Sequence, residues 1–207
     1  NTDTKQVMKP RMDIFALNVE QSYKEIIPEV IEKGYSRIPV FEESIDNVQG
    51  ILYVKDLLPY LHRKVFDWTT LLREPYFVPE NKKLDDLLNE FKDKKNHLAI
   101  VVDEYGGTSG LISLEDIIEE IVGEITDADT QNGWLTIEVK NRFERGDTLE
   151  LITPQGNHTF QLNDLENTEG TAMSAAPGSG HVVRIPTADT SLANVDAHAL
   201  LMRYLPA

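Results

Sequence analysis

The sequence contains no cysteine among its 207 residues. This absence excludes disulfide bonds, a thiolate nucleophile and a thiolate metal site. It also leaves the redox compartment undetermined, because cysteine usage is the feature that would indicate one. Hydrophobic residues make up 41% and aromatic residues 8% of the chain, which is typical of a soluble globular protein.

Positive charge is scarce as well. The chain has 20 Lys and Arg against 35 Asp and Glu, which gives a formal net charge of −15. Nucleic acids and anionic membranes are bound by clustered Lys and Arg, so this composition argues against either as a general partner. A local basic site stays compatible with it.

Long apolar runs are also missing. A membrane-spanning helix needs about 18 to 20 consecutive apolar residues, and the sequence has no run near that length. No signal peptide is recognisable at the N-terminus. The abrupt start at "NTDTKQVMKP" predicts a piece of a longer protein.

An internal repeat organises the first 126 residues. "RIPVFEESIDNVQGILYVKDLL" and "HLAIVVDEYGGTSGLISLEDII" align without a gap at an offset of 60, so that Gly50 corresponds to Gly110 and Asp56 to Asp116. Each copy reads as strand, turn, strand and helix, and each is preceded by a further strand and an amphipathic helix. We therefore predict two β-α-β-β-α repeats, at about 1–62 and 63–126, that pack as one body.

The wording of these repeats resembles a known family. "VMKPRMDI", "GYSRIPVF", "GILYVKDLL" and "HLAIVVDEYGGTSGLISLEDIIEEIVGEI" are similar to the tandem CBS-domain pair of the CorC/HlyC family, nearest to a gliding-motility-associated branch. The resemblance covers roughly residues 5–126. It implies a link to magnesium and cobalt efflux, a homodimer formed through the pair, and a membrane transport domain ahead of it. It implies a cytoplasmic module, at the cytoplasmic face of the bacterial inner membrane in the full-length parent.

The same resemblance implies a ligand, an adenosine nucleotide of the ATP or AMP class, with or without Mg²⁺. Its motif is Gly, two apolar residues, Ser or Thr, two residues and Asp, which the second copy matches with Ser113 and Asp116. A carboxylate at a helix start suits ribose hydroxyls, and a hydroxyl beside helix N–H groups suits phosphate. The first copy has Tyr53 in place of the hydroxyl residue, so Asp56 is the weaker nucleotide-binding candidate, in a cleft expected to be degenerate or occupied by something else.

Four more positions are implied by the family. Tyr35 is expected beside the adenine or ribose, and Arg37 beside the phosphates. Ile38 and Leu98 are expected to form apolar walls for the base. The Thr of the family's "MTPR" segment is Lys9 here, so that contact is not carried over.

Two plainer interpretations compete with the nucleotide site. Ser and Asp at a helix start cap the helix in most proteins, which would leave a ligand-free dimerisation scaffold. The carboxylates of Glu115, Glu119, Glu120 and Glu124 form rows at i, i+4 that could hold Mg²⁺ through water, but a solvated helix face is favoured over a metal site. His97 is interpreted as a core or capping residue. No nucleophile, base and oxyanion arrangement is present, so an enzyme is not predicted.

The C-terminal part has a different character. After a polar join at 127–132, short alternating runs separated by Gly, Asn, Asp and Pro predict a small β-barrel over 133–207, with the last segment favoured as a strand. The fold class as a whole is therefore α+β. "GWLTIEVKNRFERGDTLELITPQGN", "APGSGHVVRIP" and "ALLMRYL" resemble the C-terminal domain of the collagenase-like peptidase family, members of which are tied to tRNA hydroxylation. That family's catalytic domain lies upstream, so no activity is implied.

The second part adds two open questions. Its basic residues form either a weak RNA-facing patch or scattered surface charge: Lys140, Arg142, Arg145, Arg184, His158 and His181. Binding of tRNA or a translation partner through the barrel is accordingly an alternative function. The two resemblances point to different families, so the join is a natural fusion, a chimera or two molecules under one numbering.

Overall fold

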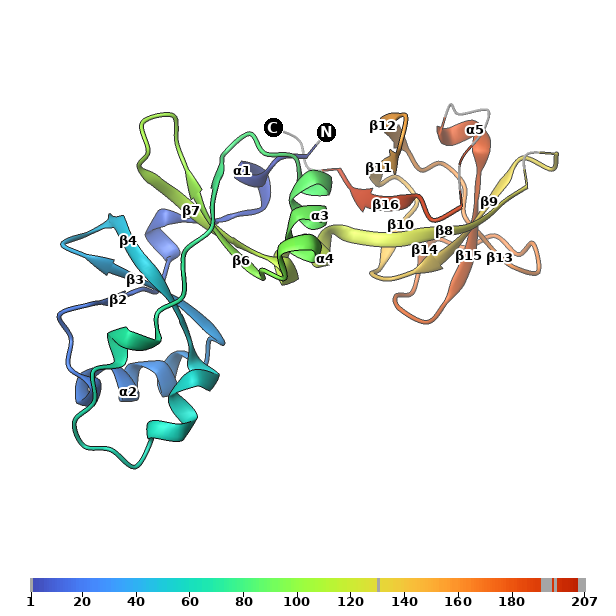
Figure 1. The fold of residues 1–207 in the computed structure, drawn as a ribbon. Helices are drawn as coiled ribbons and strands as arrows, with labels where there is room; N and C mark the ends of the chain where they lie inside the picture. The colour runs from blue at the N-terminus through green and yellow to red at the C-terminus, as the bar shows by residue number, and fades with distance from the viewer. Residues whose placement is uncertain (1, 130, 191–194, 196, 205–207) are drawn as a thin grey trace. The chain divides into compact units, whose positions relative to one another are not determined.

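The computed structural model describes residues 2–129, 131–190, 195 and 197–204, which separate into two compact units (Figure 1). We call the first the repeat unit; it consists of Val7–Lys82 and Glu90–Leu114. We call the second the β-rich unit; it consists of Asn1–Gln6, Lys83–Asn89 and Glu115–Ala207. The chain therefore passes between the units several times.

The first repeat has the predicted order of elements. These are β2 (Leu17–Asn18), α2 (Tyr23–Lys33), β3 (Arg37–Glu42), β4 (Ser44–Tyr53) and the 3-10 helix η2 (Val54–Tyr60). β2 is parallel to β3, and β3 is antiparallel to β4. α2 begins with a capping box of Ser22 and Glu25 and ends at Gly34, whose φ of 69° is the left-handed conformation that glycine favours.

The second repeat follows the same order, which confirms the repeat. Its elements are β5 (Phe77–Pro79), α3 (Leu84–Lys94), β6 (Leu98–Val102), β7 (Thr108–Ser113) and α4 (Leu114–Glu120). Its sheet gains a fourth strand, β1 (Lys9–Pro10), which pairs with β7. Shorter segments complete this part of the chain: α1 (Thr4–Val7), η1 (Arg11–Asp13) and η3 (Trp68–Leu71).

The sheet of the first repeat buries both of its faces. One face packs on the repeat's own helices, in a cluster that includes Leu17, Ile26, Val30, Ile38, Val40, Leu52 and Trp68. The other face packs on the sheet of the second repeat, where Val48 and Ile51 meet Leu98 and Ile100. Because each repeat supplies only one layer of helices, the pair must form one body to exclude water from the remaining face.

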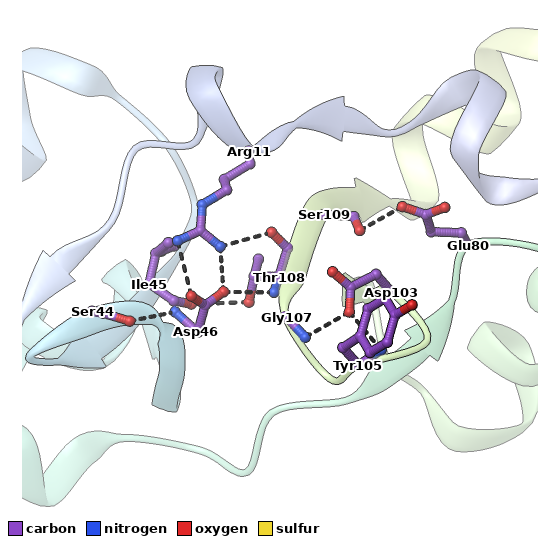
Figure 2. A network of polar contacts seen from close by, with 10 residues as sticks. All are labelled: Arg11, Ser44, Ile45, Asp46, Glu80, Asp103, Tyr105, Gly107, Thr108 and Ser109. Atoms are coloured by element: carbon purple, nitrogen blue, oxygen red, sulfur yellow. Dashed lines mark hydrogen bonds and ion pairs between the residues drawn. The ribbon is translucent and has the colours of Figure 1, made fainter.

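A polar network also joins the two repeats (Figure 2). The Arg11 guanidinium forms an ion pair with Asp46 of the first repeat and donates to the carbonyl oxygen of Thr108 in the second, at 3.0 Å. Asp46 in turn accepts a hydrogen bond from the backbone N–H of Thr108 at 2.8 Å. Nearby, Asp103 accepts from the backbone N–H groups of Tyr105 and Gly107 and so closes the turn between β6 and β7.

Segments from outside each repeat lie along the second strand of its antiparallel pair, which is β4 in the first repeat and β7 in the second. We call this strand the second strand of the repeat. The backbone of Lys9 pairs with Leu111 in β7, and that of Arg73 pairs with Ile51 in β4. A Cβ atom on Gly110 would lie 2.6 Å from the Lys9 carbonyl oxygen, and one on Gly50 would lie 3.0 Å from that of Arg73. The two glycines that align in the repeat thus permit the same close approach of backbones.

The β-rich unit is built on a seven-stranded sheet. Its order is β12-β11-β16-β8-β9-β15-β13, and a separate pair joins β10 and β14. The bounds are β8 (Ile121–Asp129), β9 (Trp134–Val139), β10 (Phe143–Glu144), β11 (Thr148–Thr153), β12 (Gly156–Gln161), β13 (Glu166–Asn167), β14 (Ala175–Ala176), β15 (Val182–Pro186) and β16 (Leu200–Arg203), with a short helix α5 (Thr187–Thr190). The expected strand at the C-terminal segment is confirmed as β16.

The boundary between the parts differs from the prediction. The predicted join at 127–132 is not a free linker, because β8 begins at Ile121, directly after α4, and runs to Asp129. β8 pairs with β9 and β16 and supplies Val122 and Ile125 to the apolar core of the unit. The sheet was expected to start at residue 133, but it starts twelve residues earlier, at Ile121.

The start of the chain also belongs to the β-rich unit. Thr2, which is 3% exposed, donates its backbone N–H to a carboxylate oxygen of Glu150 at 3.3 Å. Glu150 lies in β11 and is itself only 1% exposed. The carbonyl oxygen of Thr2 accepts from the backbone N–H of Leu84 at 3.2 Å, which ties the same segment to the start of α3.

We expect Gly110→Ala to lower the free energy of unfolding by about 1–3 kcal/mol, because the added methyl group overlaps the Lys9 backbone. Gly50→Ala, where the approach is slightly wider, should lose less. Gln49→Ala, at an exposed neighbouring position, is the control and should change little. Urea unfolding followed by circular dichroism measures all three, and equal losses for Gly110→Ala and Gln49→Ala would contradict the close approach.

The Arg11–Asp46 ion pair predicts a pH dependence. The hydrogen bond from Arg11, supported by the Thr108 N–H, lowers the pKa of Asp46, so its contribution is present above the unfolded pKa and is lost as pH falls through the lowered one. Both side chains are nearly half exposed, so Asp46→Asn should cost only about 0.5–1 kcal/mol at pH 7. The difference from wild type should disappear in urea melts near pH 2. A difference that persists there would show that charge is not its source.

Candidate functional site

The Ser-x-x-Asp motif lies where β7 passes into α4. Ser113 is the last residue of β7 and is the cross-strand partner of Leu98, the first residue of β6. The structure thus brings two of the predicted site residues together. Asp116 follows in the first turn of α4, and both Ser113 and Asp116 are half-buried and take part in polar interactions.

Tyr35 lies between a cation and an aromatic ring. The Lys9 ammonium donates to its hydroxyl at 3.0 Å and lies 4.9 Å from its ring centroid, while Phe15 stacks at 6.1 Å. The hydrogen bond from Lys9 lowers the pKa of Tyr35, since a neighbouring positive charge favours the phenolate. The ring is 42% exposed, so it remains accessible to a planar ligand.

A hollow opens beside Tyr35 on the repeat unit. Its volume is about 480 Å³, and its polar lining includes Tyr35, Ser36, Arg37, Tyr53 and Lys55. Arg37 begins β3 opposite Tyr53, and its guanidinium carbon lies 5.3 Å from the Tyr53 ring centroid. The hollow thus brings Tyr35 and Arg37 together with residues of the first copy, and neither Ser113 nor Asp116 lines it.

The carboxylate of Asp56 is already paired within the chain. Arg73 donates to it through Nη2 at 2.7 Å and through Nε at 3.1 Å. The same guanidinium lies 3.9 Å from the ring centroid of Tyr53, the residue that replaces the hydroxyl of the motif. The first copy thus holds its Asp with an internal cation, as is expected of a degenerate cleft.

The two predicted apolar walls differ in their surroundings. Ile38 is 0% exposed and packs inside the first repeat, so its side chain does not border the hollow. Leu98 packs between the two sheets with Val48 and Ile51. Leu98 is the cross-strand partner of another predicted site residue, Ser113.

The contacts of Lys9 and Arg73 are ones that sequence reasoning did not predict. Each comes from the segment ahead of a repeat, and each reaches an aromatic ring of the first repeat. The signal was present in the spacing, because "MKP" and "LREP" stand at similar distances before the two copies. It could not be used without knowing that these segments pair with the repeat's second strand.

The acidic row predicted on one helix is divided by the structure. α4 ends at Glu120, so Glu124 lies in β8, where it contacts His198 at 3.0 Å and Lys140 at 3.6 Å. The hydrogen bond with His198 lowers the pKa of Glu124. Within the described ranges, no three acidic or histidine side chains gather in a way that could hold a metal ion.

Comparisons with known proteins follow this division of the chain. A model of the CBS domain matches residues 5–63 and 69–123, which together are more than half of the sequence. The magnesium and cobalt efflux protein CorC of Pasteurella multocida is 32% identical over 206 residues, covering 95% of this chain and 69% of that protein. The chain belongs to the CorC/HlyC family of CBS-domain proteins. The family resemblance seen in the sequence is thereby confirmed.

The match to the Pasteurella relative extends beyond the CBS pair, since it covers 95% of this CorC/HlyC chain. Residues 119–203 also match the peptidase family U32 C-terminal domain, which confirms the second resemblance and by its name alone establishes no catalysis. The CorC protein of Escherichia coli strain K12 is 43% identical over 125 residues. The chain spans 59% of the length of hemolysin C from Brachyspira hyodysenteriae and 43% of that of the Escherichia coli protein.

Solved structures support the CBS fold of this CorC/HlyC chain. The CBS domain of a bacterial CNNM/CorC family Mg²⁺ transporter in complex with ATP is 41% identical, with a TM-score of 0.55. It covers 57% of this chain, and this chain covers 85% of it. Across the part of the chain that the structure describes, no helix combines the length and apolarity needed to cross a bilayer.

We expect Lys9→Met to raise the pKa of Tyr35 toward its ordinary value of about 10, because the cation that favours the phenolate is removed. Lys33→Met is the matched control and should have a smaller effect, since Lys33 contributes less. An NMR titration of chain labelled with ¹³C at tyrosine Cζ measures both. A Tyr35 pKa that is unchanged by Lys9→Met would refute the contact.

Proposed function

We propose that the chain is a regulatory module that binds an adenosine nucleotide of the ATP or AMP class and controls an attached membrane ion-transport domain. The observation that carries the proposal is the ATP complex of the CNNM/CorC family CBS domain, which is 41% identical to this chain. This chain has the required hydroxyl and carboxylate, Ser113 and Asp116, at the strand end where the motif is expected. In the full-length parent the module lies at the cytoplasmic face of the bacterial inner membrane.

Each side chain has a role that fits its chemistry. The carboxylate of Asp116 accepts hydrogen bonds from the ribose hydroxyls. These hydrogen bonds are strong because the acceptor is charged. Ser113 and Arg37 bind phosphate oxygens, and Tyr35 lies against the base. Lys9 adds a cation beside Tyr35 and so favours a ligand that is anionic.

The first cleft takes no nucleotide in this proposal. Arg73 already satisfies the carboxylate of Asp56, so a ribose would have to displace a charged partner from it. We therefore propose one nucleotide site per chain. Any Mg²⁺ enters as a counterion of the bound phosphates and is not held by a protein cage.

The module regulates only if the nucleotide favours one arrangement of the pair over another. We propose that the pair acts as a homodimer. The helices of the repeat unit expose large apolar side chains, Ile31 at 73% and Leu58 at 63%, as a partner surface requires. Neither the CBS pair nor the β-rich unit acts as an enzyme in this proposal.

The alternative of RNA binding through the β-rich unit is disfavoured by its ion pairs. Lys140 contacts Glu138 at 3.0 Å, Arg142 contacts Glu144 at 2.7 Å, and Arg145 contacts Asp164 at 3.2 Å. Arg184 is likewise paired with Glu166. Because each of these cations has an acidic neighbour, they do not combine into a positive surface of the kind that phosphate backbones need.

The proposal predicts ligand-dependent stability. Melting temperatures are measured with ATP, ADP and AMP, each with and without Mg²⁺. A nucleotide at about 100 times its Kd should add roughly 2.7 kcal/mol to the state that binds it. Asp116→Ala should abolish this stabilisation because it removes the carboxylate that binds the ribose hydroxyls.

Glu119→Ala is the matched control, because it removes one negative charge from the exposed side of the same helix. It should keep the full nucleotide effect. If no nucleotide shifts the melting temperature of the wild-type chain, the ligand-free scaffold is the correct interpretation. If Asp116→Ala and Glu119→Ala respond alike, the motif is not the site.

A further inference from the structure

α4 carries Asp116 but is too short to hold itself in place. It has seven residues, and helices of this length are marginal without support from the rest of the protein. The last carbonyl groups of a helix also need donors from outside it. The chain continues from Glu120 directly into β8, and Ile121 does not adopt the left-handed conformation that often closes a helix.

The missing donors come from the turn between β9 and β10. The side-chain amide of Asn141 lies 2.8 Å from the carbonyl oxygen of Ile121, 3.2 Å from that of Ile118 and 3.3 Å from that of Glu119. The backbone N–H groups of Lys140 and Asn141 both donate to the carbonyl oxygen of Val122, at 2.9 and 3.2 Å. Asn141 therefore closes the end of α4 and fixes its junction with β8.

A second anchor acts on the same helix end. The side chain of Glu120 is only 16% exposed, and its Oε2 atom finds no hydrogen-bond donor among the described residues but faces the Arg203 guanidinium at 4.0 Å. Burial raises the pKa of Glu120, and the positive charge of Arg203 partly opposes this rise. Arg203 belongs to β16 and also donates to the carbonyl oxygen of Arg142 at 3.2 Å. Two distant parts of the β-rich sheet thus hold the last turn of α4.

We propose that Asn141 is a positioning residue for the nucleotide motif, and that the β-rich unit sets nucleotide affinity by holding α4 in the orientation that presents Asp116. The inference rests on the function proposed above and assigns a regulatory role to the β-rich unit. Coupling between two sites is reciprocal. A nucleotide that binds at Asp116 must therefore stabilise the contacts that Asn141 makes at the other end of the helix.

The first test compares nucleotide affinities by calorimetry with ATP, below the onset of melting for each variant. Asn141→Ala should weaken ATP binding on the order of tenfold, which corresponds to about 1.4 kcal/mol. Asn141→Asp should weaken it further, because it turns a carboxylate toward the carbonyl oxygens of α4. Asn132→Ala is the matched control, since the Asn132 amide donates to Asp129 in the same unit, and the variant should bind ATP like wild type.

A purely structural role for Asn141 would lower the melting temperature but leave the ATP affinity of the folded chain unchanged, and that result would overturn the proposal. If Asn141→Ala does not fold, Arg203→Met removes the second anchor instead and should weaken ATP binding in the same direction. An unchanged affinity in a folded Arg203→Met chain would then overturn it.

The second test needs no variant. Hydrogen exchange of the Lys140 and Asn141 amides, which donate to Val122, is measured with and without saturating ATP. Slower exchange with ATP is expected. Unchanged exchange in a chain that binds ATP would overturn the coupling but leave the nucleotide site intact, whereas a wild-type chain that binds no nucleotide would overturn both proposals.

Discussion

A three-stranded sheet has two faces, and the helices of one repeat cover only one of them. In the first repeat the second face carries Val48 and Ile51, which pack against Leu98 and Ile100 of the other repeat. The free energy of burying this apolar surface holds the pair together, with the Arg11–Asp46 contact as a smaller polar addition. The positions of β3, β4, β6 and β7, and of every candidate residue at their ends, follow from this packing.

The segment that leads into each repeat is captured by the same arrangement. Lys9 and Arg73 each lie along the second strand of a repeat, where Gly110 and Gly50 let the backbones approach. Each then brings a cation to a tyrosine ring, but their further partners differ. Arg73 meets a carboxylate, Asp56, whereas Lys9 meets a hydroxyl, that of Tyr35. Two segments that are captured in the same way thereby place their cations in different electrostatic surroundings.

Much of this architecture was predictable from local patterns. The gapless alignment of the copies predicted the order of elements, and the strand character of the last segment was correctly inferred. The contacts of Lys9 and Arg73 were not predictable, because they depend on strands far away in the sequence. The end of α4 was misplaced for a related reason. Ile117, Ile118, Ile121 and Val122 fit a helix face, but pairing with β9 and β16 makes the last two part of a strand. The pattern alone does not separate these alternatives.

The contact between Thr2 and Glu150 joins residues that are 148 positions apart in the sequence. Bringing two residues together across such a separation costs loop-closure entropy. The contact is therefore expected to form near the end of folding, when other contacts have already shortened the loop. During synthesis Thr2 is made long before β11, so its contact with Glu150 has to wait for that later strand. The β-rich unit, most of which follows the repeat unit in the sequence, is thus completed by a short segment that precedes the repeat unit.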